Sequence, residues 1–550
     1  MPAVAAPART SRPAAVGPTD GRAAGPDAAP LPPHLTAERI RALAARAFYA
    51  DGDQARDTLT VRAPFSGEIV AELPAAGPAD VTAAFAQARR AQTAWAGRPF
   101  AARARVLTRL HDLMLDHADE AMDLVQLESG KARADAMLEV MDVALVARYY
   151  AHHGRAALAR SGAAGFLPGL TSVEVNRVPV GVVGIIAPWN YPLTMAITDA
   201  LPALLAGNAV VLKPAEQTPL TALLAATLAD EAGLPEGLLT VVVGDGPTLG
   251  PALLAAADFV HFTGSTEVGR LIAGQAAERL VGCSLELGGK NPMVVLDDAD
   301  LDTAAAGAMM ACFASAGQLC VSAERLYVHR AVYDAFLANL TARVERLRVG
   351  PGFTWDTEMG SLAGPEQLEK VEAHVADAVA KGATVLTGGR ALPELGPYFY
   401  APTILTGVTP AMTLYAEETF GPVVAVYPFD SDDEAVAQAN DSPYGLNASV
   451  WTGSEAHGRR VARRLRFGTV GVNDAYAAAW ASTAAPMGGF GQSGLGRRHG
   501  AEGIRKYTEA QTVAVERGLP LTKLTEAASE RLAGAALTAL RVVRRLPGLR

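Results

Sequence analysis

The sequence predicts an α/β protein with two doubly wound domains and a small β extension. Short, wholly apolar runs alternate with helical segments along much of the chain, which is the pattern of parallel strands covered on both faces. Two distant segments, 171–178 and 508–515, instead alternate apolar and polar residues, which predicts a paired strand extension outside both domains. A chain of 550 residues is long enough for two or three domains.

The composition excludes several classes of protein. Half of the residues are hydrophobic and 19% are charged, as in ordinary globular proteins. The net charge of −9 provides no basic field for nucleic acid, and three cysteines are too few for a disulfide framework. No apolar run reaches the length of a membrane span, and no secretory signal begins the chain. We therefore expect a cytoplasmic protein without nucleic-acid partners or a membrane span.

The N-terminal part of the chain is predicted to begin as a tail and to continue as helices. Residues 1–33 are rich in Ala, Pro and Gly and lack hydrophobic periodicity, which is typical of a disordered tail. From Leu35 onward the pattern favours helix, with clear helical spacing in segments that start near Asp80, near Leu107 and at Ala132.

The first domain is predicted to contain a parallel sheet. Its apolar runs are residues 182–186, 209–212, 239–243, 259–262 and 293–296. Ligands of such sheets bind beyond the carboxyl ends of the strands, which directs attention to 213–216 and 263–269.

The remaining boundaries follow from these patterns. The dinucleotide-binding domain is predicted at 34–160 and 182–291, the oligomerisation strands at 161–181 and 505–517, the catalytic domain at 292–504, and an amphipathic tail at 518–550. Strands of the catalytic domain are predicted near 384–386, 423–427, 448–451 and 469–472. The Arg-containing tail helix is expected to pack on the enzyme body rather than on an anionic surface.

Three turns carry groups suited to covalent carbonyl chemistry. Cys320 lies in a Gly-containing turn just before a strand-like run, where backbone N–H groups can face the atom that a thiol attacks. Taken alone, such a cysteine is more often a buried apolar residue. Glu286 offers a carboxylate and Asn190 an amide donor in two other Gly- or Pro-rich turns. Because these residues belong to different domains, we expect the site in an interdomain cleft.

A helix start between Gly264 and Gly269 is a candidate phosphate site. Ser265 is placed to cap the helix, whose first N–H groups would then face an anion. An ordinary capped helix is the alternative, and the G-x-G-x-x-G fingerprint does not follow these strands.

Two further pairs of residues suggest ribose contacts. Lys213 and Glu216 follow a central strand, where the carboxylate can accept from ribose hydroxyls and would repel a 2′-phosphate, so the pair favours NAD over NADP. Glu418 and Phe420 precede a Gly-Pro turn and could hold a second ribose and a flat ring. The alternative for Lys213 and Glu216 is a pair of solvated charges. The histidines show no metal-binding spacing, so no catalytic metal is expected.

Together, five motifs resemble those of the aldehyde dehydrogenase superfamily, in that family's order and over residues 55–517. They are Pro188-Trp-Asn-Tyr-Pro192, Phe262-Thr-Gly-Ser-Thr-Glu-Val-Gly269, Glu286-Leu-Gly-Gly-Lys-Asn-Pro292, Gly317-Gln-Leu-Cys320 and Glu417-Glu-Thr-Phe-Gly-Pro422. The resemblance is greatest to succinate-semialdehyde dehydrogenases of actinobacterial type, through residues 484–489, 493–500 and 506–509.

The resemblance implies a role for each candidate residue. Cys320 would be the nucleophile, Glu286 the general base and Asn190 the oxyanion donor. The cofactor would contact Trp189, Lys213, Glu216, Gly264, Ser265, Gly269, Glu418 and Phe420. The implied reaction oxidises a small aldehyde, expected to be succinate semialdehyde, to its acid with NAD(P) through a cysteine thioester. Apart from the resemblance, the paired strands 171–178 and 508–515 suggest a homodimer or homotetramer, with a surface hairpin as the alternative.

The sequence departs from the resemblance at positions that concern the substrate and the cofactor. Many succinate-semialdehyde dehydrogenases have Arg six residues before the nucleophile, where this chain has Ala314, and nothing in the sequence directs Arg325 into the pocket. Relatives of this type are often described as NADP enzymes, whereas Glu216 favours NAD. The alternatives are a dehydrogenase of medium-chain or aromatic aldehydes on the same fold and, more remotely, a cofactor-independent cysteine hydrolase.

Overall fold

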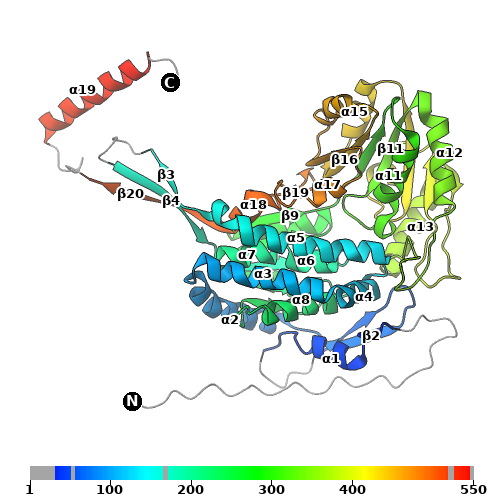
Figure 1. The fold of residues 1–550 in the computed structure, drawn as a ribbon, viewed down its shortest axis with the longest axis horizontal. Helices are drawn as coiled ribbons and strands as arrows, with labels where there is room; N and C mark the ends of the chain where they lie inside the picture. The colour runs from blue at the N-terminus through cyan, green and yellow to red at the C-terminus, as the bar shows by residue number, and fades with distance from the viewer. Residues whose placement is uncertain (1–30, 51–55, 165–170, 518–524, 546–550) are drawn as a thin grey trace. The chain divides into compact units, whose positions relative to one another are not determined.

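The computed structural model describes residues 31–50, 56–164, 171–517 and 525–545. The chain divides into two compact units (Figure 1). Unit 1 comprises Met1–Ala157 and Pro179–Tyr507, and unit 2 comprises Leu158–Val178 and Thr508–Arg550. Most of the predicted N-terminal tail, residues 1–30, lies outside the described residues, as does part of the predicted C-terminal tail.

The first sheet of unit 1 has six strands in the order β19-β9-β8-β5-β6-β7. Its strands are β5 (Val182–Ile186), β6 (Ala209–Lys213), β7 (Leu239–Val241), β8 (Phe259–Thr263), β9 (Gly282–Glu286) and β19 (Gly494–Leu495). All pairs are parallel except β9 with the edge strand β19. Four of the five predicted runs are therefore confirmed in this sheet.

The fifth predicted run, residues 293–296, was placed in the wrong sheet. It forms β10 (Asn291–Val295), which pairs with strands of the second sheet. An apolar run reports that a strand is buried on both faces, but it does not report which strands lie beside it. The true fifth parallel strand, β9, was not predicted as a separate element, because Gly282 and Ser284 interrupt its apolar character.

Ten helices of the described chain accompany the first sheet. They are α1 (Ala37–Ala44), α2 (Pro78–Ala96), α3 (Phe100–Asp116), α4 (Ala118–Ser129), α5 (Arg133–Leu158), α6 (Pro192–Ile197), α7 (Ala200–Ala206), α8 (Pro219–Glu231), α9 (Gly246–Ala256) and α10 (Thr266–Glu278). The three predicted helical segments near Asp80, Leu107 and Ala132 are confirmed as α2, α3 and α5. Helix α2 contacts β5, β6 and β7, so its apolar face covers the half of the sheet that ends at β7.

The prediction that the chain favours helix from Leu35 onward was wrong between α1 and α2. An antiparallel hairpin, β1 (Thr58–Arg62) with β2 (Ile69–Pro74), lies there instead. Gly67 adopts φ 75° in the connecting turn, and its N–H donates to the carbonyl of Ala63 over 2.7 Å. The turn closes the hairpin through its backbone, which helical periodicity alone does not reveal.

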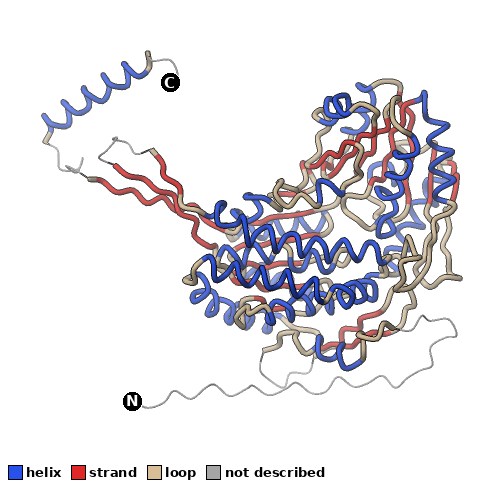
Figure 2. Tube along the Cα trace, viewed as in Figure 1, coloured by secondary structure: helices blue, strands red, loops and turns tan. Residues whose placement is uncertain are grey.

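The second sheet of unit 1 has seven strands in the order β12-β13-β14-β11-β10-β16-β17. Besides β10, these are β11 (Ala323–His329), β12 (Thr384–Thr387), β13 (Thr403–Thr406), β14 (Val423–Phe429), β16 (Asn447–Trp451) and β17 (Thr469–Val472). Only the edge strand β12 runs antiparallel to its neighbour. Helices enclose the strands of this sheet (Figure 2), so the doubly wound prediction is confirmed.

The remaining elements of unit 1 are short or medium in length. They are α11 (Leu301–Phe313), η1 (Ala314–Gly317), η2 (Arg330–Val332), α12 (Tyr333–Val344), α13 (Pro365–Ala380), α14 (Thr413–Ala416), α15 (Asp432–Asn440), β15 (Tyr444–Gly445), α16 (Glu455–Ala462), α17 (Ala477–Trp480), β18 (Phe490–Gly491) and α18 (Gly500–Arg505).

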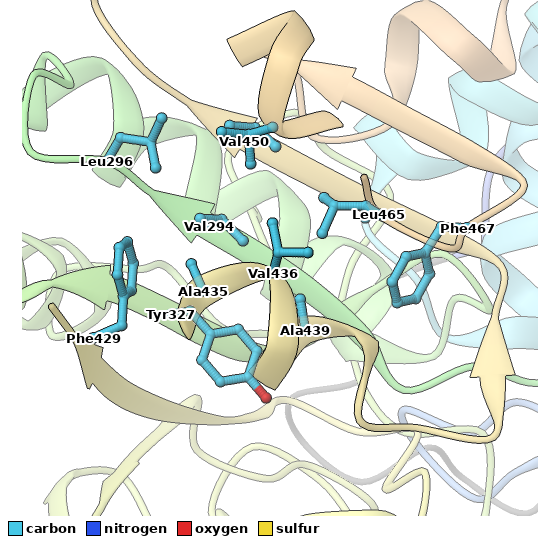
Figure 3. Packing of buried hydrophobic residues seen from close by; sticks show 12 residues of the cluster. Val294, Leu296, Tyr327, Phe429, Ala435, Val436, Ala439, Val450, Leu465 and Phe467 are labelled. Atoms are coloured by element: carbon cyan, nitrogen blue, oxygen red, sulfur yellow. The ribbon is translucent and has the colours of Figure 1, made fainter. Parts of the chain in front are cut away.

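A dense apolar core fixes α15 on the second sheet (Figure 3). Val294 of β10 and Val450 of β16 are fully buried and face Ala435 and Val436 of α15. Phe467 closes one side of the cluster. Burial of such side chains stabilises the fold by about 1.5–3 kcal/mol each. The cluster therefore holds α15 firmly against β10 and β16.

Unit 2 contains a three-stranded sheet and a helix. Strand β4 (Thr171–Pro179) lies between β3 (Ser161–Ala163) and β20 (Thr508–Glu516), which confirms the predicted pairing of 171–178 with 508–515 (Figure 2). Helix α19 (Glu526–Val543) has no buried residue, so its expected packing on the enzyme body stays a prediction. None of the described helices has the length and apolar character needed to cross a bilayer.

Candidate active site

The candidate site lies between the carboxyl ends of strands in the first sheet of unit 1 and the amino ends of strands in the second. Lys213 and Glu286 are the last residues of β6 and β9, and Asn190 and Ser265 follow the carboxyl ends of β5 and β8. In the second sheet the candidate residues lie before the strands instead of after them. Cys320 precedes the amino end of β11, and the Glu418 loop precedes the amino end of β14. The amino end of β10 lies close to the carboxyl end of β9, because only four residues connect the two strands.

A left-handed turn presents Cys320. Ser315, Ala316 and Gly317 have φ of 51°, 55° and 72°, which turns the chain away from the end of α11. At Gly317 a Cβ atom would lie 2.1 Å from the carbonyl oxygen of Gly421, so only glycine fits. The buried carboxylate of Asp135 accepts the Ser315 N–H over 2.8 Å and holds the turn in place.

Side-chain amides from the second sheet fix the backbone of the nucleophile loop. Asn291 Nδ2 donates to the carbonyl oxygens of Cys320 (2.7 Å) and Ser322 (2.9 Å). Asn447 Nδ2 donates to the carbonyl of Val321 over 3.2 Å. Because these carbonyls are satisfied from the sheet side, the Cys320 loop has little freedom to rotate.

Asn190 is buried beside the nucleophile loop. Its side chain is 8% exposed, and Nδ2 donates to the carbonyl of Gln318 over 2.9 Å. The backbone carbonyl of Asn190 accepts from Lys131 Nζ over 2.7 Å, and Glu139 pairs with that ammonium over 2.6 Å. An amide nitrogen carries two N–H groups, so one orients the side chain and the other can donate to an oxyanion.

Glu286 has the properties of a proton acceptor. It ends β9, is 7% exposed, and its Oε1 has no hydrogen-bond partner. Burial raises the pKa of Glu286 to about 7, against the opposing charges of Arg498 and Lys506. A carboxyl group with a free oxygen and a pKa near neutrality is suited to general-base catalysis.

The thiol of Cys320 is protonated in the protein alone. Burial raises its pKa to about 12, and the carboxylates of Glu286 and Glu418 add to that rise through space. Glu286 and Glu418 therefore act electrostatically on the sulfur, and the role predicted for Glu286 beside it stays a prediction. These electrostatic effects also mean that any partner that supplies positive charge to the site favours the thiolate.

The start of α10 can receive a phosphate. Ser265 caps this helix, and its Oγ accepts the Val268 N–H over 3.3 Å, which confirms the predicted cap. Gly264 N–H donates to the Glu286 carbonyl over 3.1 Å and thus ties this loop to the base. At Gly269 a Cβ atom would lie 2.5 Å from Leu287, so close packing requires glycine there.

The remaining cofactor candidates form two groups. Lys213 is buried at the end of β6, and its Nζ pairs with Glu216 Oε2 over 2.9 Å, while the Glu216 side chain is 42% exposed and can be reached by a ribose. Glu418 Oε1 accepts the Gly289 N–H over 2.8 Å. The rings of Trp189 and Phe420 meet edge to face at 5.6 Å. These groups fit a dinucleotide. The start of α10 suits a phosphate, the Lys213 ammonium and the two carboxylates suit ribose hydroxyls, and the aromatic pair suits a flat ring.

Arg325 does not serve the pocket. It is 2% exposed, and its guanidinium donates to the carbonyl oxygens of Lys290, Gln438 and Ala439. The residue after Ala314 contacts an aromatic side chain: Ser315 Oγ donates a hydrogen bond to the Tyr191 hydroxyl. The ring centroids of Tyr191 and Trp480 are 5.5 Å apart. Arg325 therefore joins β11 to the end of α15 through hydrogen bonds.

Sequence analysis missed the groups that hold the site together, chiefly Asp135, Asn291 and Glu324. Asn291 lies inside a quoted motif, so its amide could have been singled out. Asp135 and Glu324 carried no signal, because each lies in a segment that reads as ordinary helix or strand. In the described part of the chain, no cluster of His, Cys, Asp or Glu is placed to hold a metal ion.

Comparison with known proteins agrees with this geometry. The model of the aldehyde dehydrogenase family matches residues 49–513. The chain belongs to the aldehyde dehydrogenase family. It is an enzyme of that family with the family's α/β fold, as the five motifs implied.

Several relatives of this aldehyde dehydrogenase carry more specific names. A protein of Mycolicibacterium smegmatis named "Putative succinate-semialdehyde dehydrogenase [NADP(+)]" is 48% identical over 94% of this chain and 100% of its own. The crystal structure of a Burkholderia pseudomallei succinate-semialdehyde dehydrogenase matches with a TM-score of 0.81 and 38% identity, over 86% of this chain and 98% of its own. A Staphylococcus aureus betaine aldehyde dehydrogenase in complex with NAD+ matches with a TM-score of 0.82 and 32% identity, over 90% of this chain and 100% of its own.

Proposed function

We propose that this enzyme oxidises succinate semialdehyde to succinate with NAD or NADP. Two observations support the proposal: the Asn190 amide donates to the loop that carries Cys320, and the unpartnered Glu286 carboxyl raises the pKa of the Cys320 thiol through space. The names of the relatives from Mycolicibacterium and Burkholderia support the choice of aldehyde.

The chain's own residues account for the steps around the carbonyl carbon. The Cys320 thiol releases its proton to solvent as its sulfur adds to the aldehyde carbon, and the oxygen that becomes negative accepts from the second N–H of Asn190 and from the Cys320 backbone N–H. When bound, a nicotinamide dinucleotide would supply the two-electron acceptor, so that loss of hydride from this carbon leaves a thioester on Cys320. Glu286 then takes a proton from water as that water attacks the thioester on Cys320, which releases the acid and the thiol.

The cofactor contacts follow from the two groups of residues described above. Ser265 and the start of α10 would hold the pyrophosphate, Lys213 and Glu216 the adenosine ribose, and Glu418 with Phe420 the nicotinamide half. A carboxylate at Glu216 disfavours a 2′-phosphate, so we propose NAD as the preferred nucleotide, although relatives are named for NADP(+).

An aldehyde panel tests the reaction and its substrate. We expect succinate semialdehyde to give a higher kcat/KM than hexanal or benzaldehyde, measured as reduced nucleotide formed with NAD and with NADP. Cys320→Ala should abolish turnover, whereas Cys283→Ala, which changes a cysteine on β9, should retain it. A preference for hexanal or benzaldehyde would favour the alternative substrate class, and ester cleavage without nucleotide would favour a cysteine hydrolase.

The assembly and location are also proposed. Strand β20 is an edge strand of the unit 2 sheet, and it exposes Val513 and Val515. An apolar edge strand is suited to pairing with another subunit, so we propose a homodimer or homotetramer. The three free cysteines fit the reducing cytoplasm.

A further inference from the structure

Glu324 is a buried carboxylate that joins both sides of the cofactor site. It lies on β11, is 3% exposed, and pairs with Lys290 Nζ over 2.5 Å. The same carboxylate accepts the backbone N–H groups of Thr419 (2.9 Å) and Phe420 (2.8 Å). One side chain therefore binds the β9–β10 connection and the Glu418–Phe420 loop together.

The Glu418–Phe420 loop depends on such an anchor because its backbone is unusual. Phe420 has φ 57°, a left-handed conformation that non-glycine residues rarely adopt. Its N–H is bound by Glu324, and its carbonyl accepts from Gln367 Nε2 over 2.6 Å. Conformations of this kind persist when surrounding contacts determine them, and they concentrate where a ligand is held.

The anchor acts on the two side chains assigned to the nicotinamide half of the cofactor. Phe420 meets the ring of Trp189, and Glu418 Oε1 accepts from Gly289 N–H, one residue before Lys290. The proposed adenosine contacts, Lys213 and Glu216, lie on other elements and pair with each other, whereas the Glu324 carboxylate bonds Lys290, Thr419 and Phe420. Loss of the anchor should therefore weaken one half of the cofactor site and spare the other.

We infer that Glu324 is a positioning residue that holds Glu418 and Phe420 in the geometry needed to bind the nicotinamide half of the dinucleotide. This inference rests on the proposed function. Glu324 acts through hydrogen bonds to the loop backbone, while Lys290 neutralises its charge in the buried site.

The test compares NADH with ADP, which lacks both the nicotinamide and its ribose. Isothermal titration of Glu324→Gln with NADH and with ADP should show a rise of roughly tenfold in the Kd of NADH, as expected for loss of a charge-assisted hydrogen bond. The Kd of ADP should stay within about twofold, since the proposed adenosine contacts are remote from Glu324. In turnover assays the KM for NAD should rise and kcat should fall. Glu417→Gln, which changes the exposed neighbouring carboxylate, is the matched control.

A second variant separates positioning from folding. Lys290→Met combined with Glu324→Leu removes the buried pair together, so no unpaired charge remains and the fold should be retained. It should lose NADH binding as Glu324→Gln does. Unchanged NADH binding in a folded variant, or equal weakening of NADH and ADP binding, would overturn the inference.

Glu418→Gln tells the two proposals apart. If this variant binds NADH normally, the role proposed for Glu418 fails, and the inference about Glu324 fails with it. If Glu418→Gln weakens NADH binding but both Glu324 variants do not, the proposed function stands and only the inference about Glu324 is wrong.

Discussion

Burial gives Glu286 both of the properties that a general base needs. Desolvation disfavours the charged carboxylate and raises its pKa to about 7, and Oε1 is left without a partner. Below pH 7 the group is mostly the neutral acid and cannot accept a proton. Above pH 7 it is the carboxylate that can take a proton from water.

The first prediction concerns the pH dependence of turnover. We expect kcat to rise with pH through about 7, because thioester hydrolysis needs ionised Glu286. Glu286→Gln should lower kcat by at least about 100-fold, a typical contribution of general-base catalysis, and should remove this ionisation from the kcat–pH profile. Stopped-flow kinetics should retain a burst of reduced nucleotide. Glu278→Gln, an exposed residue of α10, is the control; an unchanged profile in Glu286→Gln would assign the base elsewhere.

Glu216 supports a second prediction, about nucleotide preference. Its carboxylate is partly exposed and paired with Lys213, so it can accept from a ribose and repel a 2′-phosphate. Glu216→Ser should shift the ratio of kcat/KM for NAD over NADP toward NADP by roughly tenfold, the change expected for about 1.4 kcal/mol. Glu236→Ser, at an exposed position, should leave the ratio unchanged. A constant ratio in both variants would mean that Glu216 does not reach the ribose.

Among elements, the η1 turn has the strictest stereochemical requirement. Three successive residues with positive φ place Cys320, and only the last of them is glycine. Asp135 and the amides of Asn291 and Asn447 supply the hydrogen bonds that compensate for this conformation. The motif around Cys320 was recognisable in the sequence, but the left-handed path was not.

The third prediction tests this turn. Gly317→Ala should lower the free energy of unfolding by about 1–3 kcal/mol from backbone strain alone, and the contact with the Gly421 carbonyl adds to that loss. Activity should fall because the nucleophile moves. Gly274→Ala, in α10 with open space around it, should instead be neutral or raise stability by up to about 1 kcal/mol. Thermal unfolding and turnover of both variants provide the measurement, and equal stability of the two would contradict the argument.

At the scale of the whole chain, unit 1 contains two mainly parallel sheets whose strands reach the candidate site by opposite ends. Candidate residues of the first sheet lie at the carboxyl ends of its strands, and those of the second lie before the amino ends of its strands. The short β9–β10 connection starts after Glu286 and contains Gly289 and Lys290. Unit 2 contributes the three-stranded sheet that we propose as the contact between subunits.

The fourth prediction concerns that contact. Replacing Val513 and Val515 by Lys on the exposed edge strand β20 should oppose strand pairing between subunits. Light scattering after gel filtration should then report the mass of one chain, 57.0 kDa, instead of a dimer or tetramer. Gln275→Lys adds a charge to exposed α10 and should keep the assembly intact. An unchanged mass for the β20 variant would place the contact elsewhere.

The sequence by itself determined the fold class, most strands and helices, the family and the residues that can carry the chemistry. These features have local causes: apolar runs, helical periodicity, a capping serine and short motifs with reactive groups. Only the tertiary structure decided that β10 joins the second sheet, that Arg325 clamps backbone carbonyls away from the pocket, and that Asp135 and Glu324 support the loops of the site. A buried polar group takes its partners from whichever backbone groups the fold leaves unsatisfied beside it, and no spacing along the chain records that choice.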